Sequence, residues 1–204
     1  MNQPVVAAFD FDGTLTRRDT LFHFLLQVAG WSAFTRNMIV LAPTLAAYGL
    51  GLLRNDLAKE KVLTRFLSGM PMQALQEQGV SFAAQALPRL LRSVAMRRLA
   101  WHKQQGHRCV VISASLELYV QPWAQAAGFD AVIASRLEQV DGRCTGKLQG
   151  GNCYGAEKAL RLQALLGAKE RYTLYAYGDS RGDSELLSMA DHAYFKQIPE
   201  DELN

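Results

Sequence analysis

The sequence of 204 residues contains little cysteine, and its three cysteines, Cys109, Cys144 and Cys153, form no Cys-x-x-Cys pair. An odd number of cysteines without such a pair indicates neither a disulfide framework nor a zinc site. The first residues also lack the basic region that opens a signal peptide. These absences exclude the class of small disulfide-bonded secreted domains, and they favour a cytoplasmic protein in a reducing compartment.

No apolar run is long enough to predict a transmembrane helix. The uncharged stretch Met38–Leu53 has 16 residues and contains Pro43, Gly49 and Gly51, whereas a spanning helix needs about 20 apolar residues. The stretch therefore predicts either a buried helix of an inserted domain or a segment that touches lipid at the membrane surface.

Acidic residues are scarce between residues 36 and 108, where eleven Lys and Arg stand against three Asp and Glu, although the net charge of the chain is only +3. None occurs between Glu77 and Glu117. This pattern is typical either of a solvated helical face or of a surface that attracts an anionic substrate or an anionic membrane. The arginines that would form such a surface are Arg89, Arg92, Arg97 and Arg98.

The order of predicted elements changes along the chain. Val5–Phe9 predicts a buried strand that ends at Asp10. Residues 20–105 predict four or five helices, with breaks near Gly30, Asn55, Gly69–Pro71 and Pro88. The later elements are expected as strands 108–112, 131–133, 172–177 and 193–195, helices 116–127, 155–166 and 183–189, and an antiparallel hairpin over 136–150 that turns at Asp141–Gly142.

One strand, a long helical insertion and then alternating strands and helices predict an α/β fold with a three-layer, parallel-sheet core. We expect residues 1–16 and 106–204 to form this core and residues 17–105 to form an all-helical cap. Because the insertion directly follows the first strand, it can cover the edge of the sheet where ligands bind.

Two motifs that follow strands offer groups suited to phosphate chemistry. Asp10 and Asp12 lie two residues apart at the end of the first strand, so both can face one site, and two adjacent carboxylates favour a bound Mg²⁺. Gly13 lets the chain turn sharply after them. Ser113-Ala114-Ser115 offers a hydroxyl and a backbone N–H to a phosphoryl oxygen, although Ser115 could simply cap a helix.

Two later motifs add a cation and more carboxylates. Lys158 lies in the first turn of a helix, where the helix dipole disfavours a cation unless the side chain points into an anionic site. Asp179 and Asp183 lie four residues apart after a strand. Taken singly, Lys158 could be a surface lysine and Asp183 a helix cap.

In this order the four motifs resemble the haloacid dehalogenase superfamily of phosphatases: Asp-x-Asp-Gly-Thr, then Ser, then Lys, then Gly-Asp-x-x-x-Asp. The resemblance implies a Rossmann-like core with an inserted helical type-I cap, and Mg²⁺-dependent hydrolysis of a phosphomonoester through an aspartyl phosphate. Asp10 would be the nucleophile, and Asp12 the general acid and base. The implied ligands of Mg²⁺ are Asp10, the Asp12 carbonyl and Asp179, and Asp183 would hold water bound to Mg²⁺ or orient Lys158. The phosphoryl oxygens would be bound by Ser113, the Ala114 N–H and Lys158.

The motif spellings are similar to the phosphoserine-phosphatase-like branch, subfamily IB. Asp19 lies where those enzymes carry a glutamate that binds the substrate ammonium, and Lys61 and Arg65 are candidates for their cap arginine. Gly182 replaces a substrate-binding asparagine of that branch. A closer resemblance, which includes Cys153–Lys158, is to the phosphatidylglycerophosphatase C family.

These resemblances leave three hypotheses. The first is a phosphatase for phosphatidylglycerol phosphate or a related anionic phosphate, which works on a lipid head group at the inner face of an anionic membrane. The second is a soluble phosphatase for a small metabolite, such as an amino-acid or amino-alcohol phosphate. The third is a non-catalytic binding module, which the filled catalytic positions disfavour. No nucleic-acid partner is expected.

Overall fold

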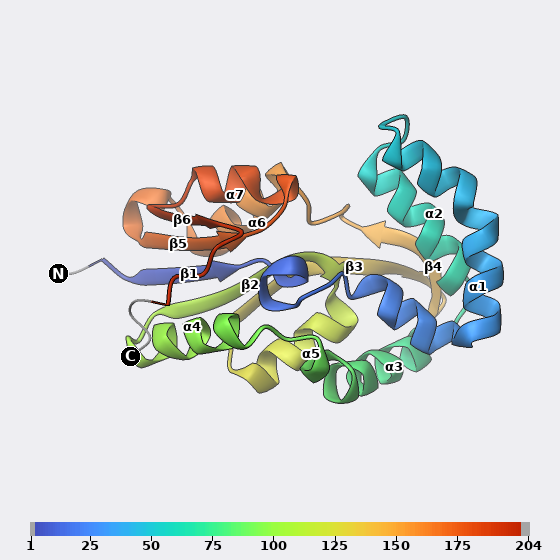
Figure 1. The fold of residues 1–204 in the computed structure, drawn as a ribbon, viewed down its shortest axis with the longest axis horizontal. Helices are drawn as coiled ribbons and strands as arrows, with labels where there is room; N and C mark the ends of the chain where they lie inside the picture. The colour runs from blue at the N-terminus through green and yellow to red at the C-terminus, as the bar shows by residue number, and fades with distance from the viewer. Residues whose placement is uncertain (1–2, 201–204) are drawn as a thin grey trace.

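The computed structural model describes residues 3–200. Among them, six strands form one sheet in the order β4-β3-β2-β1-β5-β6 (Figure 1). The strands are β1 (Val5–Phe9), β2 (Arg108–Leu116), β3 (Ala131–Val140), β4 (Arg143–Gln149), β5 (Thr173–Gly178) and β6 (His192–Phe195). All neighbours are parallel except β3 and β4. The predicted α/β class is therefore confirmed.

Strand β1 lies at the centre of the sheet, between β2 and β5. Its alternate residues enter two different cores: Ala7 and Phe9 pack on one face, and Val6 and Ala8 on the other. A strand that is covered on both faces needs apolar residues at every position, which explains its uninterrupted apolar sequence.

Helices cover both faces of the sheet, as Figure 1 shows: α6 and α7 lie on one face, and α4 and α5 on the other. The helices are α1 (Leu21–Gly49), α2 (Asn55–Leu67), α3 (Met72–Gln85), α4 (Ser93–Gln104), α5 (Glu117–Ala127), α6 (Ala156–Leu166) and α7 (Ser184–Ser188). This arrangement gives the three layers that the sequence predicted.

The helical insertion lies at the carboxyl end of the strands (Figure 1). Helix α1 is broken at Gly30, where φ is 73° and ψ is 164°, and its second arm packs against α2. Helix α2 in turn packs against β4, and α3 packs against α5. The predicted breaks near Gly30 and Asn55 are confirmed, and so is the hairpin turn, where Asp141 and Gly142 both have positive φ.

The uncharged stretch Met38–Leu53 is largely exposed. Only Leu41 is buried on this arm of α1, whereas Ile39, Leu50 and Leu52 are 69%, 75% and 79% exposed. The expectation of a buried helix is therefore wrong for most of this stretch, because this arm of α1 packs against α2 and leaves much of its remaining surface exposed. Within residues 3–200, no helix combines the length and the apolar character needed to cross a bilayer.

The division into core and cap stays a prediction. The residues of helix α4 fall within the range 17–105 that was predicted as the cap, but the helix packs against β2 and the turn Phe11–Leu15 of the core. The ends of the predicted core, residues 1–2 and 201–204, lie outside the described residues.

The four arginines expected on one basic surface have different surroundings, and of these Arg89 is exposed. Arg98 is fully buried, with its guanidinium 4.0 Å from the centre of the Trp101 ring. Arg92 donates to the Gly13 carbonyl over 2.8 Å, and Arg97 forms a salt bridge with Glu200 over 3.1 Å. The expectation of an exposed basic residue at position 98 is therefore wrong, because α4 turns that side chain toward the aromatic core of the sheet.

Candidate active site

The first two carboxylates lie at the end of β1, where the chain turns away from the sheet. Asp10 is 5% exposed, and its backbone N–H donates to the Tyr177 carbonyl of β5 over 2.9 Å. Gly13 adopts φ of +80°, and a Cβ there would lie 2.1 Å from the Asp179 carboxylate. Only glycine permits this close approach, so the first and fourth motifs meet at Gly13.

Lys158 joins the nucleophile candidate to the fourth motif. Its ammonium is buried and lies 2.5 Å from Asp10 Oδ1 and 2.6 Å from Asp183 Oδ1. Lys158 lies in the first turn of α6, where the side chain points into this cluster of carboxylates. The resulting charge attraction explains why a cation is tolerated at that end of the helix.

Asp183 holds both Lys158 and the loop that carries Asp179. Its second oxygen, Oδ2, accepts hydrogen bonds from the backbone N–H groups of Asp179 and Ser180, over 3.2 and 3.0 Å, and from the Ser180 hydroxyl over 2.9 Å. Because both oxygens of Asp183 already have donors, this fully buried side chain fixes the loop that carries Asp179.

Burial sets the proton affinities of the cluster. It raises the pKa of Asp10 to about 8, against the opposing charge of Lys158. Burial alone would lower the pKa of Lys158, but the Asp10 and Asp183 carboxylates outweigh it and raise that pKa. Burial also raises the pKa of Asp179. A further cation would favour the ionised carboxylates that a nucleophile and a metal ligand must be.

The donor set fits a divalent cation. Asp10, Asp179 and Asp183 each offer a carboxylate oxygen, and these oxygens lie within 4.8 Å of one another. Oδ1 of Asp179 is buried and has no hydrogen-bond partner among the described residues. An all-oxygen site with an unsatisfied acceptor suits Mg²⁺. Asp10 and Asp179 would then bind the ion directly, and Asp183 would hold the loop that carries Asp179.

Asp12 is held on both of its oxygens. Oδ1 accepts from the backbone N–H of Thr20 over 2.8 Å, and Oδ2 accepts from the Ser115 hydroxyl. Burial and then the charge of Asp19 raise the pKa of Asp12 to about 6, while the hydrogen bonds from Ser115 and Thr20 oppose this rise. A carboxyl group with such a pKa can both donate and accept a proton near neutral pH.

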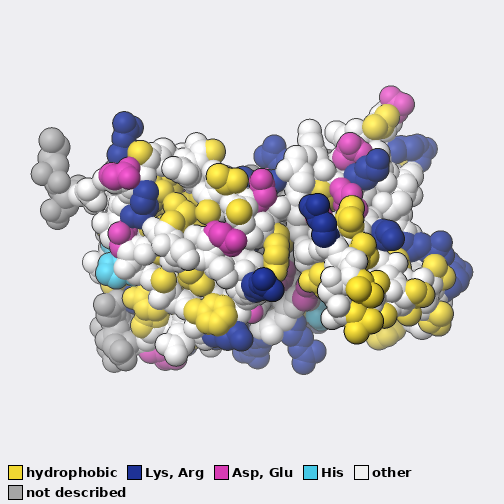
Figure 2. Space-filling model, turned by 90° about the horizontal axis from the view of Figure 1, so that it is seen from above, with side chains coloured by type: hydrophobic (Ala, Val, Ile, Leu, Met, Phe, Trp, Pro, Cys, Tyr) yellow, Lys and Arg dark blue, Asp and Glu magenta, His cyan; other side chains and the backbone are white. Residues whose placement is uncertain are grey.

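A cavity of about 540 Å³ connects these groups. The core contributes Asp10, Asp12, Ser113, Ala114, Lys158 and Asp179, and the helical insertion contributes Leu45, Tyr48, Asn55 and Lys59. Ser113 is almost fully buried, and its hydroxyl accepts from the Ser115 N–H over 2.9 Å. The surface is hollowed between the two parts of the molecule (Figure 2).

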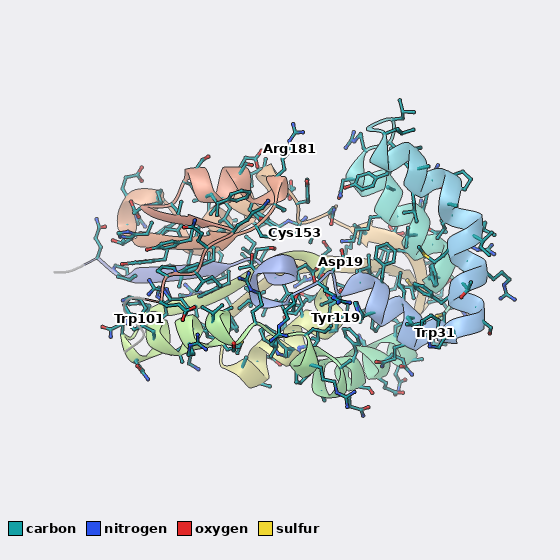
Figure 3. The ribbon with its side chains drawn as sticks, in the orientation of Figure 1. Asp19, Trp31, Trp101, Tyr119, Cys153 and Arg181 are labelled. Atoms are coloured by element: carbon teal, nitrogen blue, oxygen red, sulfur yellow. The ribbon has the colours of Figure 1, made fainter. Side chains whose placement is uncertain are left out.

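The three cap-side candidates differ in their placement. Asp19 lines the cavity, and its carboxylate accepts from the Leu21 N–H over 2.9 Å. Lys61 and Arg65 are exposed and do not line it; Arg65 instead donates to Asn37 over 2.9 Å. Figure 3 shows Asp19 near the middle of the molecule, between the sheet and α1.

Lys59 is a site residue that the sequence analysis missed. Its ammonium donates to the Ala114 carbonyl and, over 2.8 Å, to Asn152 Oδ1, and burial lowers its pKa to about 8. On a helix, residues two apart point about 200° away from each other, so Lys59 faces the cavity while Lys61 faces solvent. A signal existed: Lys59 falls on the same helical stripe as the buried Val62 and Phe66.

This fold and this site define the class: a Rossmann-like α/β enzyme whose buried lysine and carboxylates meet at the carboxyl ends of parallel strands. The comparison with family models agrees, since the haloacid dehalogenase-like hydrolase model matches residues 7–188. The chain belongs to that family.

Two relatives by sequence extend this result. The protein CicA of Caulobacter vibrioides is 37% identical over 198 residues, which is 96% of this chain and 87% of CicA. A probable phosphatase of Mycobacterium tuberculosis, Rv3661, is 41% identical over 98 residues, which is 47% of this chain and 33% of that protein.

Two solved structures share the fold. A Bordetella pertussis protein of unknown function superposes with a TM-score of 0.76 at 26% identity, covering 92% of this chain and 87% of that one. A phosphoserine phosphatase with a phospho-aspartyl intermediate analogue has a TM-score of 0.62 at 18% identity, covering 93% and 84%.

Proposed function

We propose that the protein is a Mg²⁺-dependent phosphomonoester hydrolase that works through an aspartyl phosphate on Asp10. The observation that carries this proposal is the buried cluster in which Lys158 touches Asp10 and Asp183 while Asp179 keeps an unsatisfied oxygen. The phosphatase name of the Mycobacterium relative supports the same reaction class.

In the proposed reaction, the Asp10 carboxylate attacks phosphorus in line with the leaving oxygen and becomes phosphorylated. The Asp12 carboxyl gives its proton to the leaving alkoxide and then takes a proton from the water that hydrolyses the intermediate. Ser113, the Ala114 N–H and Lys158 hold the phosphoryl oxygens. A bound Mg²⁺ supplies positive charge that offsets the repulsion between nucleophile and phosphate.

For the substrate, we propose phosphatidylglycerol phosphate or a related anionic phosphate at the inner face of a membrane. The exposed apolar arm of α1 supports this choice, because the same arm lines the cavity through Leu45 and Tyr48. The alternative is a small amino-acid or amino-alcohol phosphate. The Asp19 carboxylate in the cavity favours it, since an ammonium group would pair with that charge.

The test is a turnover assay with an aryl phosphate, followed by a substrate panel. We expect activity that chelation of divalent cations abolishes and that added Mg²⁺ restores. The Asp10→Asn variant should lose turnover by about 10³-fold or more while it keeps its thermal unfolding temperature, because it lacks only the nucleophile.

The panel should contain phosphatidylglycerol phosphate in mixed micelles, phosphoserine and phosphoethanolamine. The highest kcat/KM identifies which of the two substrate classes is correct. An Asp10→Asn variant with near wild-type activity would exclude the covalent mechanism, and a wild-type protein that binds these phosphates without turnover would support a binding module instead.

A further inference from the structure

A chain of buried hydroxyl groups ends at Asp12. The Tyr119 hydroxyl donates to Ser115 Oγ over 2.9 Å, and Ser115 Oγ donates to Asp12 Oδ2. Thr20 Oγ1 donates to the Tyr119 oxygen over 3.2 Å. Each hydroxyl can donate one proton. Thr20 therefore donates to Tyr119, Tyr119 to Ser115 and Ser115 to Asp12, so the chain of hydrogen bonds ends on the carboxylate.

The chain is rigid because its members are packed on separate elements. Ser115 lies in β2, Tyr119 lies four residues later in α5, and Thr20 directly precedes α1. The Tyr119 ring packs against the rings of Phe24 and Phe82, with ring centres 5.1 and 5.2 Å away. Thr20, Ser115 and Tyr119 are all 3% exposed or less. Figure 3 shows Tyr119 close to the start of α1, near Asp19.

Ser115 is therefore not the helix cap that its sequence position allowed. The N-cap residue of α5 is Leu116, and no side chain caps that helix. The Ser115 hydroxyl is instead committed to Asp12.

We propose that Ser115 and Tyr119 are positioning residues, which hold the Asp12 carboxyl where it meets the leaving oxygen of the substrate. Thr20 holds the other oxygen of Asp12 through its backbone N–H. Each carboxyl oxygen can form a further hydrogen bond, and Asp12 lines the cavity, so this clamp fixes the group without blocking it. This inference rests on the proposed hydrolysis of a phosphomonoester.

The effect of displacing the Asp12 carboxyl should depend on the leaving group of the substrate. An alkoxide leaving from an alkyl phosphate needs the proton of Asp12, whereas a nitrophenolate is stable enough to leave without one. Because kcat/KM reports steps up to the first irreversible one, it isolates phosphoryl transfer from later hydrolysis of the aspartyl phosphate. A displaced Asp12 should therefore harm alkyl substrates selectively.

The experiment compares kcat/KM for the best alkyl phosphate of the panel and for p-nitrophenyl phosphate. We expect Ser115→Ala and Tyr119→Phe to lower the value for the alkyl substrate by about 10- to 100-fold and that for the aryl substrate by less than about threefold. Ser115→Thr, which keeps a hydroxyl, should restore most of the loss. Tyr172→Phe is the matched control, because it removes a buried hydroxyl that has no hydrogen-bond partner among the described residues.

An equal loss on both substrates would overturn the proposal and indicate a structural role, and so would unchanged alkyl activity. If Ser115→Ala does not fold, Tyr119→Phe decides alone, since it removes a single oxygen atom. Absence of Mg²⁺-dependent turnover by the wild-type protein on either substrate would instead contradict the proposed function itself, and the inference with it.

Discussion

Two lysines face the same cavity with different partners. The Lys158 ammonium lies between the carboxylates of Asp10 and Asp183. Lys59 donates to neutral oxygens, those of Ala114, Asn152 and, over 3.5 Å, Ser135, and within residues 3–200 it forms no salt bridge. Burying an uncompensated charge is unfavourable, so Lys59 offers a positive charge that an anionic substrate would balance.

We expect Lys59→Met to lower kcat/KM by about 10- to 100-fold, mainly through KM, because a hydrogen bond to a charged group contributes about 1.5–3 kcal/mol. Steady-state kinetics with the preferred phosphate measure the effect. Lys61→Met is the matched control, since Lys61 is exposed two residues further along α2. Equal effects of the two variants would contradict a specific role for Lys59.

Much of the candidate site could be predicted from motif order. Strand ends and one helix start predicted that Asp10, Ser113, Lys158 and Asp179 would share a site, and the structure brings them to one cavity. Their roles stay predictions. The helical spacing places Lys59 on the packed face of α2, but it does not show that this face reaches the cavity, because that depends on how α2 packs against β4.

At the scale of elements, a buried network of hydrogen bonds connects α4 to β5. The Tyr177 hydroxyl accepts from Arg98 Nε over 2.7 Å and lies 2.9 Å from His102 Nε2. His102 Nδ1 in turn lies 2.8 Å from His107 Nδ1. Burial, then the charges of Arg98 and His107, lower the pKa of His102 to about 3. Because Tyr177 immediately precedes Gly178 and Asp179, this network also anchors the loop of the fourth motif.

The network makes stability depend on pH. His102 stays neutral in the folded protein down to about pH 3, whereas the unfolded chain takes up a proton below its ordinary pKa of 6.5. The contribution of the neutral His102 to folding stability is therefore fully present above pH 6.5, and it is lost as the pH falls toward 3. Because the unfolded chain binds a proton at His102 and the folded protein does not, the free energy of unfolding should fall by about 1.4 kcal/mol between pH 7.5 and pH 5.5.

Urea unfolding of the wild type and of His102→Gln at several pH values measures this slope. The variant should lose stability at pH 7.5 but show a flatter pH dependence, while His192→Gln, at an exposed position of β6, should keep the wild-type slope. Parallel curves for wild type and His102→Gln would contradict the assignment.

Local sequence patterns predicted the helices, strands and turns better than they predicted which side chains are buried. The strand Val5–Phe9, the hairpin turn at Asp141–Gly142 and the break at Gly30 each follow from short-range rules, and each is present. The burial of Arg98 and the exposure of Ile39 could not be predicted in this way. Which face of a helix is covered depends on partners distant in sequence, and arginine can be buried where aromatic rings and a hydroxyl receive it.

At the scale of the whole molecule, one end combines the cavity with an exposed apolar surface. We call the α1 surface the set of exposed apolar side chains around the second arm of that helix, and hydrophobic side chains gather at this end in Figure 2. Its members are Trp31, Ile39, Val40, Tyr48, Leu50 and Leu52. No acidic residue occurs between Asp19 and Asp56, and Arg36 and Arg54 flank the stretch. Apolar side chains with basic neighbours are typical of a surface that binds anionic lipid.

The α1 surface predicts association with anionic vesicles. We expect the protein to sediment with vesicles that contain phosphatidylglycerol, and more weakly with neutral vesicles or at high salt. Ile39→Asp and Leu52→Asp should each weaken binding by about tenfold or more, because burying one such side chain contributes about 1.5–3 kcal/mol.

The matched control for the vesicle experiment is Leu160→Asp on α6, since Leu160 is 58% exposed but lies outside the α1 surface. It should bind like the wild type. Aryl phosphatase activity separates docking from chemistry: the α1 variants should keep it, because Ile39 and Leu52 do not line the cavity. Vesicle binding that these substitutions leave unchanged would remove the structural support for a lipid substrate and favour the small-metabolite alternative, for which Asp19 would then be the first residue to test.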